Sequence, residues 1–272
     1  MIRLGVRVAR AHADLVLAEL LVLAPGGVEE RDVSADVVEY GVYGAEGEVP
    51  ALPALRAAAG DALVEVVTEE IADDWGDRWR AFHRPIEIGG RMLVRPPWSP
   101  PPATDVIDLV IDPGQAFGTG AHATTKLCLE LLLGLEPGGA FMDLGCGSGV
   151  LAIAAARLGW SPVDGVDFDP LSVAATVDNA RANGVEVGVR RFDVLRDGPA
   201  PSSPTVAANL LRPLLLALSR AGFRDPQPRT LIASGLLCHE ADEVSAALTA
   251  RTGLSERARL EEGDWAALLL AS

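Results

Sequence analysis

The stretch that most constrains this chain is FMDLGCGSGVLAIAAARLG, residues 141–159. A short, mostly apolar run leads into Gly145, Gly147 and Gly149, and a stretch of strong helix formers follows. In α/β proteins, a strand that turns through glycines directly into a helix commonly binds a nucleotide-like ligand. A side chain in such a turn would hold the ligand away from the backbone. The chain is therefore predicted to form a strand–turn–helix cradle near its middle.

The spacing of these glycines separates three kinds of ligand. A dinucleotide site needs G-x-G-x-x-G, and Val150 occupies the last position of that pattern here. A P-loop needs G-x-x-x-x-G-K-[ST], and this region contains no lysine. The pattern present is acidic-x-G-x-G-x-G, from Asp143 to Gly149. It resembles motif I of the class I methyltransferases, which implies S-adenosylmethionine, and Asp143 suits the ammonium group of that ligand.

Acidic residues also end the next two predicted strands. Asp167 is placed so that its carboxylate can accept from both ribose hydroxyls, and Phe168 can pack on the adenine. Asp193 can accept from the adenine amino group. Asp169 followed by Pro170 is a typical helix start, so Asp169 is expected to cap the next helix.

Asn209 ends a fourth predicted strand, in the segment AANLL. Class I enzymes that methylate planar nitrogens usually carry Asn/Asp-Pro-Pro-Tyr at this place, whereas this chain has Asn-Leu-Leu-Arg. The missing proline–aromatic clamp favours an aliphatic amine as the methyl acceptor. We expect Asn209 and the backbone carbonyl of Leu210 to orient that amine.

Strands and helices alternate from residue 105 onward, which predicts a mostly parallel, doubly wound α/β sheet. The last two segments, 254–262 and 265–272, read as strands without a helix between them, so an antiparallel strand is expected at the C-terminal end. We therefore predict a Rossmann-like domain of class I methyltransferase type over residues 105–272, with a seven-stranded sheet.

The first 70 residues read as β-α-β-β-α-β, the order of a small ferredoxin-like α+β domain. They contain no cluster of titratable groups beside a glycine loop, so we expect residues 1–70 to recognise a substrate rather than to catalyse. Residues 71–104 are expected to form a linker helix and a hairpin. Five prolines in 96–104 suggest the main domain boundary there.

Two shorter patterns lie within the linker. Trp75, Trp79 and Phe82 fall at i, i+4 and i+7, which places them on one helical face and predicts packing against a neighbouring domain. The second pattern is Gly89-Gly90, which is expected to turn a hairpin.

Composition narrows the functional class. A net charge of −15 disfavours direct binding to nucleic acid and suits a basic partner, although it can also serve solubility alone. No apolar run is long enough to cross a membrane, and Asp14 and Glu19 interrupt the apolar N-terminal stretch, which argues against a signal peptide. Three scattered cysteines without a CxxC pair predict a cytoplasmic protein with no metal site.

One further segment is DPGQAFGTGAHATTKLCLELL, residues 112–132. Together with DLGCGSGVLAIAA, GVDFDP and AANLL, it resembles the PrmA family, the methyltransferases of large-subunit ribosomal protein eleven. The resemblance implies methylation of lysine side chains and of the N-terminal amine of that protein. It also implies cofactor contacts at Thr125, Gly145, Asp167 and Asn209, beneath a covering loop at 114–122.

The sequence is compatible with several alternatives. His122 is a candidate proton relay or a packing residue of the loop, and no residue stands out as an obligatory base. The acceptor could be a lysine of another protein or a small-molecule amine, although the latter would need no docking domain. A non-catalytic cofactor-binding protein is a third alternative, which the acids at three strand ends and Asn209 argue against. We expect a monomer.

Overall fold

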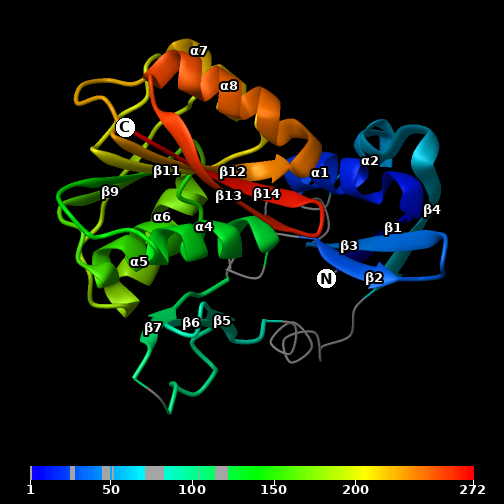
Figure 1. Cartoon of the computed structure of the whole chain (residues 1–272). Coiled ribbons are helices and arrows are strands. Elements are labelled where there is room, and N and C mark those ends of the chain that lie inside the picture. The colour runs from blue at the N-terminus through cyan, green and yellow to red at the C-terminus, as the bar shows by residue number, and fades with distance from the viewer. Residues whose placement is uncertain are drawn as a thin grey trace. The chain divides into compact units, whose positions relative to one another are not determined.

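The computed structural model describes residues 2–24, 28–44, 50, 52–70, 83–103, 105–113 and 122–272. The chain forms two compact units, residues 1–82 and 83–272, which are described separately (Figure 1). The predicted stripe of Trp75, Trp79 and Phe82 lies outside the described residues, as does the covering loop apart from His122.

The first unit is an antiparallel sheet with two helices. Its elements are β1 (Ile2–Ala9), α1 (Ala13–Leu23), β2 (Glu29–Asp32), β3 (Val37–Gly44), α2 (Leu52–Ala59) and β4 (Leu63–Glu70). The strand order is β2-β3-β1-β4, and every neighbouring pair is antiparallel. This confirms the ferredoxin-like order predicted from the sequence. Alternate residues of β1 and β3, including Val6, Val8 and Tyr40, are buried with Leu20 and Leu55 of the helices.

The other face of this sheet carries a network of buried charge. Glu39 is completely buried and accepts hydrogen bonds from Arg3 (2.7 Å), Arg7 (2.7 Å) and Arg31 (2.8 Å). Gly5 and Gly41 face each other across β1 and β3. A Cβ on Gly5 would lie only 2.9 Å from Cδ of Glu39, so these charged side chains occupy the space that larger residues would fill.

The second unit contains the remaining elements. These are β5 (Ile86–Ile88), β6 (Met92–Arg95), β7 (Ile107–Val110), α4 (Ala123–Leu133), β8 (Phe141–Leu144), α5 (Val150–Leu158), β9 (Val163–Asp167), α6 (Pro170–Ala182), β10 (Gly188–Arg191), β11 (Thr205–Asn209), α7 (Arg212–Ala221), β12 (Thr230–Leu237), α8 (Ala241–Thr252), β13 (Ser255–Glu262) and β14 (Trp265–Ala271).

Seven of these strands form one sheet in the order β10-β9-β8-β11-β12-β14-β13. The pairs from β10 to β12 are parallel, whereas β14 is antiparallel to both of its neighbours. Helices α4, α5 and α6 cover one face, and α7 and α8 cover the other (Figure 1). The predicted doubly wound sheet with an antiparallel C-terminal strand is confirmed.

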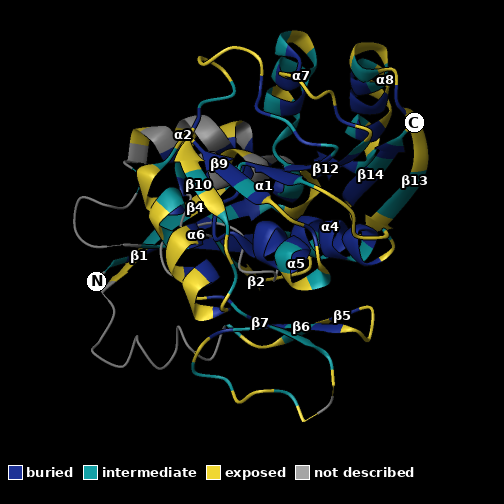
Figure 2. Cartoon of the chain, turned by 90° about the vertical axis from the view of Figure 1, so that its left-hand side faces the viewer, coloured by how far each residue is buried: buried dark blue, intermediate teal, exposed yellow. Residues whose placement is uncertain are grey.

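Burial follows from this layering. β8 is buried along its whole length, and β11 is buried except at Asn209, because helices cover both faces of the sheet. Figure 2 shows the central strands in the buried colour and exposed residues on the outer sides of α6 and α7. Among the described residues, no helix is long and apolar enough to cross a membrane.

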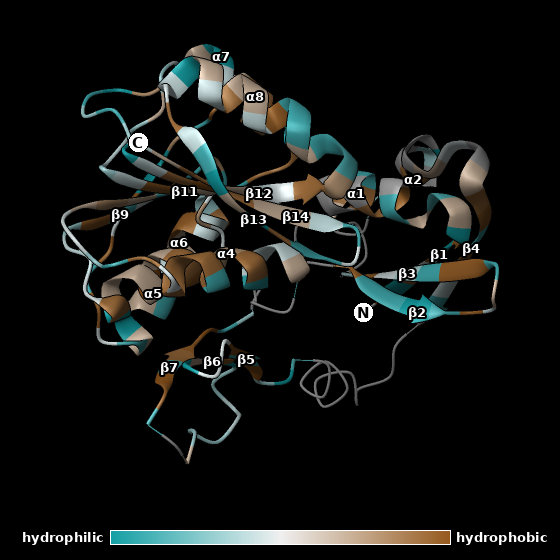
Figure 3. Cartoon of the chain, viewed as in Figure 1, coloured by the Kyte–Doolittle hydropathy of each residue, from teal (hydrophilic) through white to brown (hydrophobic). Residues whose placement is uncertain are grey.

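A small three-stranded sheet, β5-β6-β7, belongs to the second unit and is rich in hydrophobic residues (Figure 3). The hairpin turns at Gly89 and Gly90, which both have positive φ, as predicted. β7 begins the predicted alternation of strands and helices, but it pairs in parallel with β6 rather than joining the large sheet. The hairpin belongs to the second unit, and the boundary between the units lies between residues 82 and 83. The prediction of the main domain boundary within the proline-rich segment 96–104 is therefore wrong.

We predict that Glu39→Gln destabilises the first unit strongly at neutral pH and only weakly at low pH. Burial raises the pKa of Glu39, but the hydrogen bonds from Arg3 and Arg7 outweigh burial and hold it below its usual range. The carboxylate therefore stabilises the fold above its unfolded pKa of about 4.3, and this contribution is lost as pH falls toward the lower folded pKa. The loss at pH 7 should be on the order of 3 kcal/mol by thermal or urea unfolding.

Glu65→Gln is the matched control, because Glu65 also accepts from Arg7 (2.7 Å) but is exposed. Its loss should stay below about 1 kcal/mol. Equal losses in the two variants at pH 7 would contradict the interpretation that the buried network stabilises this sheet.

Candidate active site

The predicted site residues come together where strands β8, β9 and β11 end. These neighbouring parallel strands end at the same edge of the large sheet, which is where open α/β sheets bind ligands. The glycine turn follows β8, Asp167 ends β9, and Asn209 ends β11. The N-terminus of α4 brings Thr125 to the same place, because the Asn209 side chain hydrogen-bonds to it.

The turn after β8 has the backbone conformation that its glycines allow. Gly145, Gly147 and Gly149 have φ values of 75°, 53° and 83°. Gly145 N donates to the Val166 carbonyl at 2.8 Å, which ties the turn to the end of β9. A Cβ on Gly145 would lie 2.4 Å from Cδ2 of Leu210. A larger residue at this position would therefore meet both an unfavourable backbone conformation and a steric clash.

Asp143 lies beneath this turn and is almost completely buried. Its Oδ2 accepts from Ala152 N at 3.1 Å, while Oδ1 has no hydrogen-bond partner among the residues that the structure describes. Burial raises the pKa of Asp143 to about 7. A buried carboxylate oxygen without a partner is costly, and a cationic ligand group would satisfy it.

Asp167 is held from two sides by backbone amides. Its Oδ2 accepts from Gly147 N at 3.0 Å, and its Oδ1 accepts from Asp169 N at 3.0 Å. Burial raises the pKa of Asp167. Each oxygen retains a lone pair, so the carboxylate can still accept from a diol. The neighbouring Phe168 is 62% exposed, which leaves its ring free to cover a planar ligand.

Asp169 caps helix α6, as predicted. Its side chain accepts from Leu171 N at 3.0 Å, and Pro170 is the first residue of the helix. Asp193 lies in the turn after β10 rather than at the last strand position, because the strand ends at Arg191. Its Oδ1 accepts from Leu195 N at 2.9 Å, which fixes the carboxylate within this turn.

Asn209 and Thr125 are 84 residues apart in sequence, and Asn209 Nδ2 donates to Thr125 Oγ1 at 3.2 Å. Leu210 N donates to the Ser234 carbonyl at 2.9 Å. Gly235, with a φ of 85°, forms an irregularity in β12 directly against Leu210. A Cβ on Gly235 would lie 2.4 Å from the Leu210 carbonyl oxygen, so this glycine leaves the space that the carbonyl occupies.

His122 is the N-cap residue of α4, and its Nδ1 lies 2.8 Å from Thr124 Oγ1. Its ring also packs edge-on against Trp265, with centroids 4.7 Å apart. Burial lowers the pKa of His122 to about 4, so the ring is neutral at physiological pH. These contacts favour the packing role over the proton relay.

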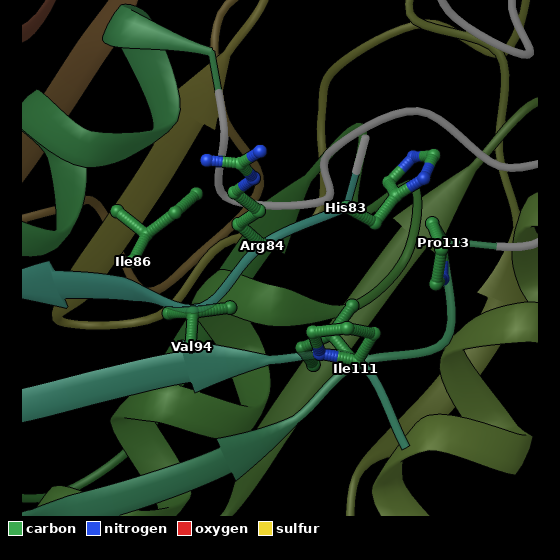
Figure 4. A pocket seen from close by; sticks show the side chains of 7 residues that line it. His83, Arg84, Ile86, Val94, Ile111 and Pro113 are labelled. Carbon is green, nitrogen blue, oxygen red and sulfur yellow. The ribbon is translucent and has the colours of Figure 1, made fainter. Parts of the chain in front are cut away.

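The sequence did not single out Gly235, Trp265 or the polar face of α6. Isolated glycines and tryptophans give no spacing signal, and their place at the site depends on tertiary contacts. A small cavity lies apart from the glycine turn, beside the small sheet, and is lined by residues such as Ile86, Val94 and Ile111 (Figure 4). Among the described residues, no group of acidic, histidine or cysteine side chains could hold a metal ion.

Comparison with known proteins agrees with this geometry. Residues 41–272 match the family model described as ribosomal protein L11 methyltransferase (PrmA). The chain belongs to the PrmA family. This confirms the resemblance that the sequence motifs indicated, and it makes the protein a methyltransferase of class I fold.

Individual PrmA relatives support the assignment. The ribosomal protein L11 methyltransferase of Pseudomonas aeruginosa (strain UCBPP-PA14) is 41% identical over 219 residues, which cover 79% of this chain and 74% of that protein. The Burkholderia cenocepacia (strain HI2424) protein of the same name is 37% identical, with 89% of each chain covered. The solved ribosomal protein L11 methylase of Lactobacillus delbrueckii subsp. bulgaricus matches with a TM-score of 0.61 and 26% identity, over 70% of this chain and 98% of that chain.

We predict that Gly235→Ala slows methyl transfer on the order of 100-fold, because the added Cβ must displace the Leu210 carbonyl. Gly253→Ala is a matched control, since Gly253 also has a positive φ of 74° but a Cβ there would meet no atom within 4 Å. Both variants should lose about 1 kcal/mol of stability from backbone strain, and Gly235→Ala should lose more because its Cβ meets backbone atoms of Leu210. Equal methyl-transfer rates in the two variants would show that the position of Leu210 is unimportant.

Proposed function

We propose that this chain transfers methyl groups from S-adenosylmethionine to ribosomal protein L11, on lysine side chains and on the N-terminal amine. The observation that carries the proposal is the match of residues 41–272 to the PrmA family, since that range contains every residue of the candidate site. The names of the relatives supply the acceptor protein.

The site fits the cofactor chemically. The unpartnered Oδ1 of Asp143 would accept from the ammonium group, and the glycine turn would admit the amino-acid end close to the backbone. Asp167 would accept from the ribose hydroxyls. The remaining residues proposed to contact the cofactor are Thr125, Gly145, Gly147, Gly149, Phe168, Asp193 and Asn209. When bound, S-adenosylmethionine supplies an activated sulfonium methyl group.

The acceptor amine must lose its proton before it attacks, because a free lysine has a pKa of about 10.4. A site that excludes water favours the neutral amine. Asn209 Nδ2 is held by Thr125, which orients the amide and presents Oδ1 as an acceptor for an amine N–H. The Leu210 carbonyl would be the second acceptor. Such positioning can lower the activation barrier by on the order of 7–11 kcal/mol.

The structure offers little support for a proton relay through His122. Burial lowers the pKa of the His122 imidazole to about 4, which makes it a weak acceptor for a proton from an ammonium ion. We propose that His122 caps α4 and packs against Trp265, and that the proton leaves to water after the amine is desolvated.

The acidic first unit suits a basic protein substrate. Residues 1–82 contain 7 arginines and no lysine against 16 aspartates and glutamates, so this unit holds a large share of the net negative charge. Opposite charge speeds encounter with a basic protein. We propose that residues 1–70 recognise the substrate, that 71–104 link the domains, and that 105–272 catalyse. We further propose that the enzyme acts as a cytoplasmic monomer.

We predict that Asn209→Ala reduces methylation of recombinant L11 by a factor on the order of 100 to 1,000, by analogy with other preorganised polar groups. Cofactor affinity, measured by calorimetry, should fall much less, because the glycine turn and Asp167 remain. Methylation is measured by mass spectrometry of L11 after incubation with labelled cofactor. Full activity in this variant would overturn the role given to Asn209, and an inactive wild-type enzyme would overturn L11 as the substrate.

We also predict that cofactor affinity falls as pH is lowered from about 7.5 to 6. The Asp143 carboxyl must be ionised to pair with an ammonium group, and burial raises its pKa to about 7 in the free protein. Binding below that pH therefore requires release of a proton, which weakens affinity by up to roughly tenfold per pH unit. Asp143→Asn should bind more weakly at pH 7.5 and show a flatter pH dependence. An identical slope in the variant would exclude Asp143 as the titrating group.

A further inference from the structure

Helix α6 and its C-cap residue Asn183 carry buried polar side chains, and three of these bond to other parts of the second unit. Thr176, Asn179 and Asn183 follow one another at spacings of three and four, which places them on one face of the helix. All three are less than a tenth exposed. Buried amides and hydroxyls are retained only where they make hydrogen bonds, so the partners of this face indicate its purpose.

Both asparagines bond the backbone at the end of β7. Asn183 accepts from Val110 N at 2.8 Å and donates to Val110 O at 2.7 Å. Asn179 accepts from Asp112 N at 2.9 Å and lies 3.4 Å from Asp112 O as a donor. The residue between them, Ile111, bonds instead to β6 through Arg95 O. The two amides therefore replace a neighbouring strand along the free edge of this segment.

Asn179 differs from Asn183 in the partner of its second hydrogen bond. Asn179 Nδ2 also donates to the Ser148 carbonyl at 2.9 Å, in the glycine turn, whereas Asn183 Nδ2 donates to the Asn179 carbonyl at 2.8 Å, within α6. Thr176 Oγ1 donates to the Gly147 carbonyl at 2.9 Å, one residue earlier. Gly147 N is held by Asp167. The Gly147–Ser148 peptides are thus fixed from α6 on one side and from β9 on the other.

We propose that Asn179 is a positioning residue for the cofactor. It holds the glycine turn in its left-handed conformation by tying the Ser148 carbonyl to α6, and it ties the same helix to the backbone at Asp112. Thr176 assists through the adjacent carbonyl. A turn that is already fixed loses less conformational freedom on binding, so the affinity for the ligand is higher. This inference rests on the proposed function only in taking the glycine turn as the cofactor site.

The test compares Asn179→Leu with Asn183→Leu. Each change leaves the β7 segment without its amide partner, so both variants should lose stability to a similar extent. Only Asn179→Leu also removes the hydrogen bond to the Ser148 carbonyl. We expect its affinity for S-adenosylmethionine, measured by calorimetry, to fall on the order of tenfold further than that of Asn183→Leu. Thermal midpoints of both proteins show whether stability is matched. Equal affinities at matched midpoints would overturn the inference.

Thr176→Val tests the same idea if Asn179→Leu does not fold, because valine keeps the volume and removes only the hydroxyl. Its affinity should fall several-fold, and an unchanged affinity would overturn the inference. Asp167→Ala distinguishes a failure of the positioning role from a failure of the proposed cofactor site. If Asp167→Ala loses binding while the α6 variants keep it, the positioning role fails alone. If all of them keep wild-type affinity, the proposed cofactor site fails and the positioning role with it.

Discussion

The second unit depends on how the chain leaves β8 and enters α5. The turn needs three left-handed residues in five positions, and only glycine reaches that conformation at little cost. The backbone amides of this turn bond to the end of β9, so its conformation and the pairing of the two strands require each other. Leu210, Asp167 and α6 all pack against the turn, and their positions follow from it.

Much of this arrangement could be predicted from sequence because its signals are local. Glycine spacing, acids at strand ends and the Asp169-Pro170 helix start each depend on a few neighbouring residues. The apolar pattern along the chain predicts the strands of the sheets, because burial on one or both faces dictates that pattern. Asp143, Asp167 and Asn209 come together because parallel strands place their carboxyl ends on the same side of the sheet.

Other features could not be predicted because they depend on partners distant in sequence. Whether β7 pairs with β6 or with the large sheet is decided by competing edges, which a single strand does not reveal. Gly235 looks like any glycine in an apolar strand until the Leu210 carbonyl is placed beside it. No sequence motif marks Asn179 and Asn183, yet both accept hydrogen bonds from the backbone at the end of β7. The sequence indicates that Asp143 suits an ammonium group, but only the structure shows the burial that raises its pKa to about 7.

The position of β14 has a consequence for how the enzyme is assembled. β13 is made first, but its only neighbour in the sheet is β14, which separates it from β12. A nascent chain that ends at β13 therefore lacks the strand with which β13 pairs in the native sheet. Trp265, the first residue of β14, also supplies the ring against which His122 packs at the start of α4. The contacts of α4 with β14 thus form only after the final hairpin closes, so the last strand to be made completes the packing at the start of the helix that carries Thr125.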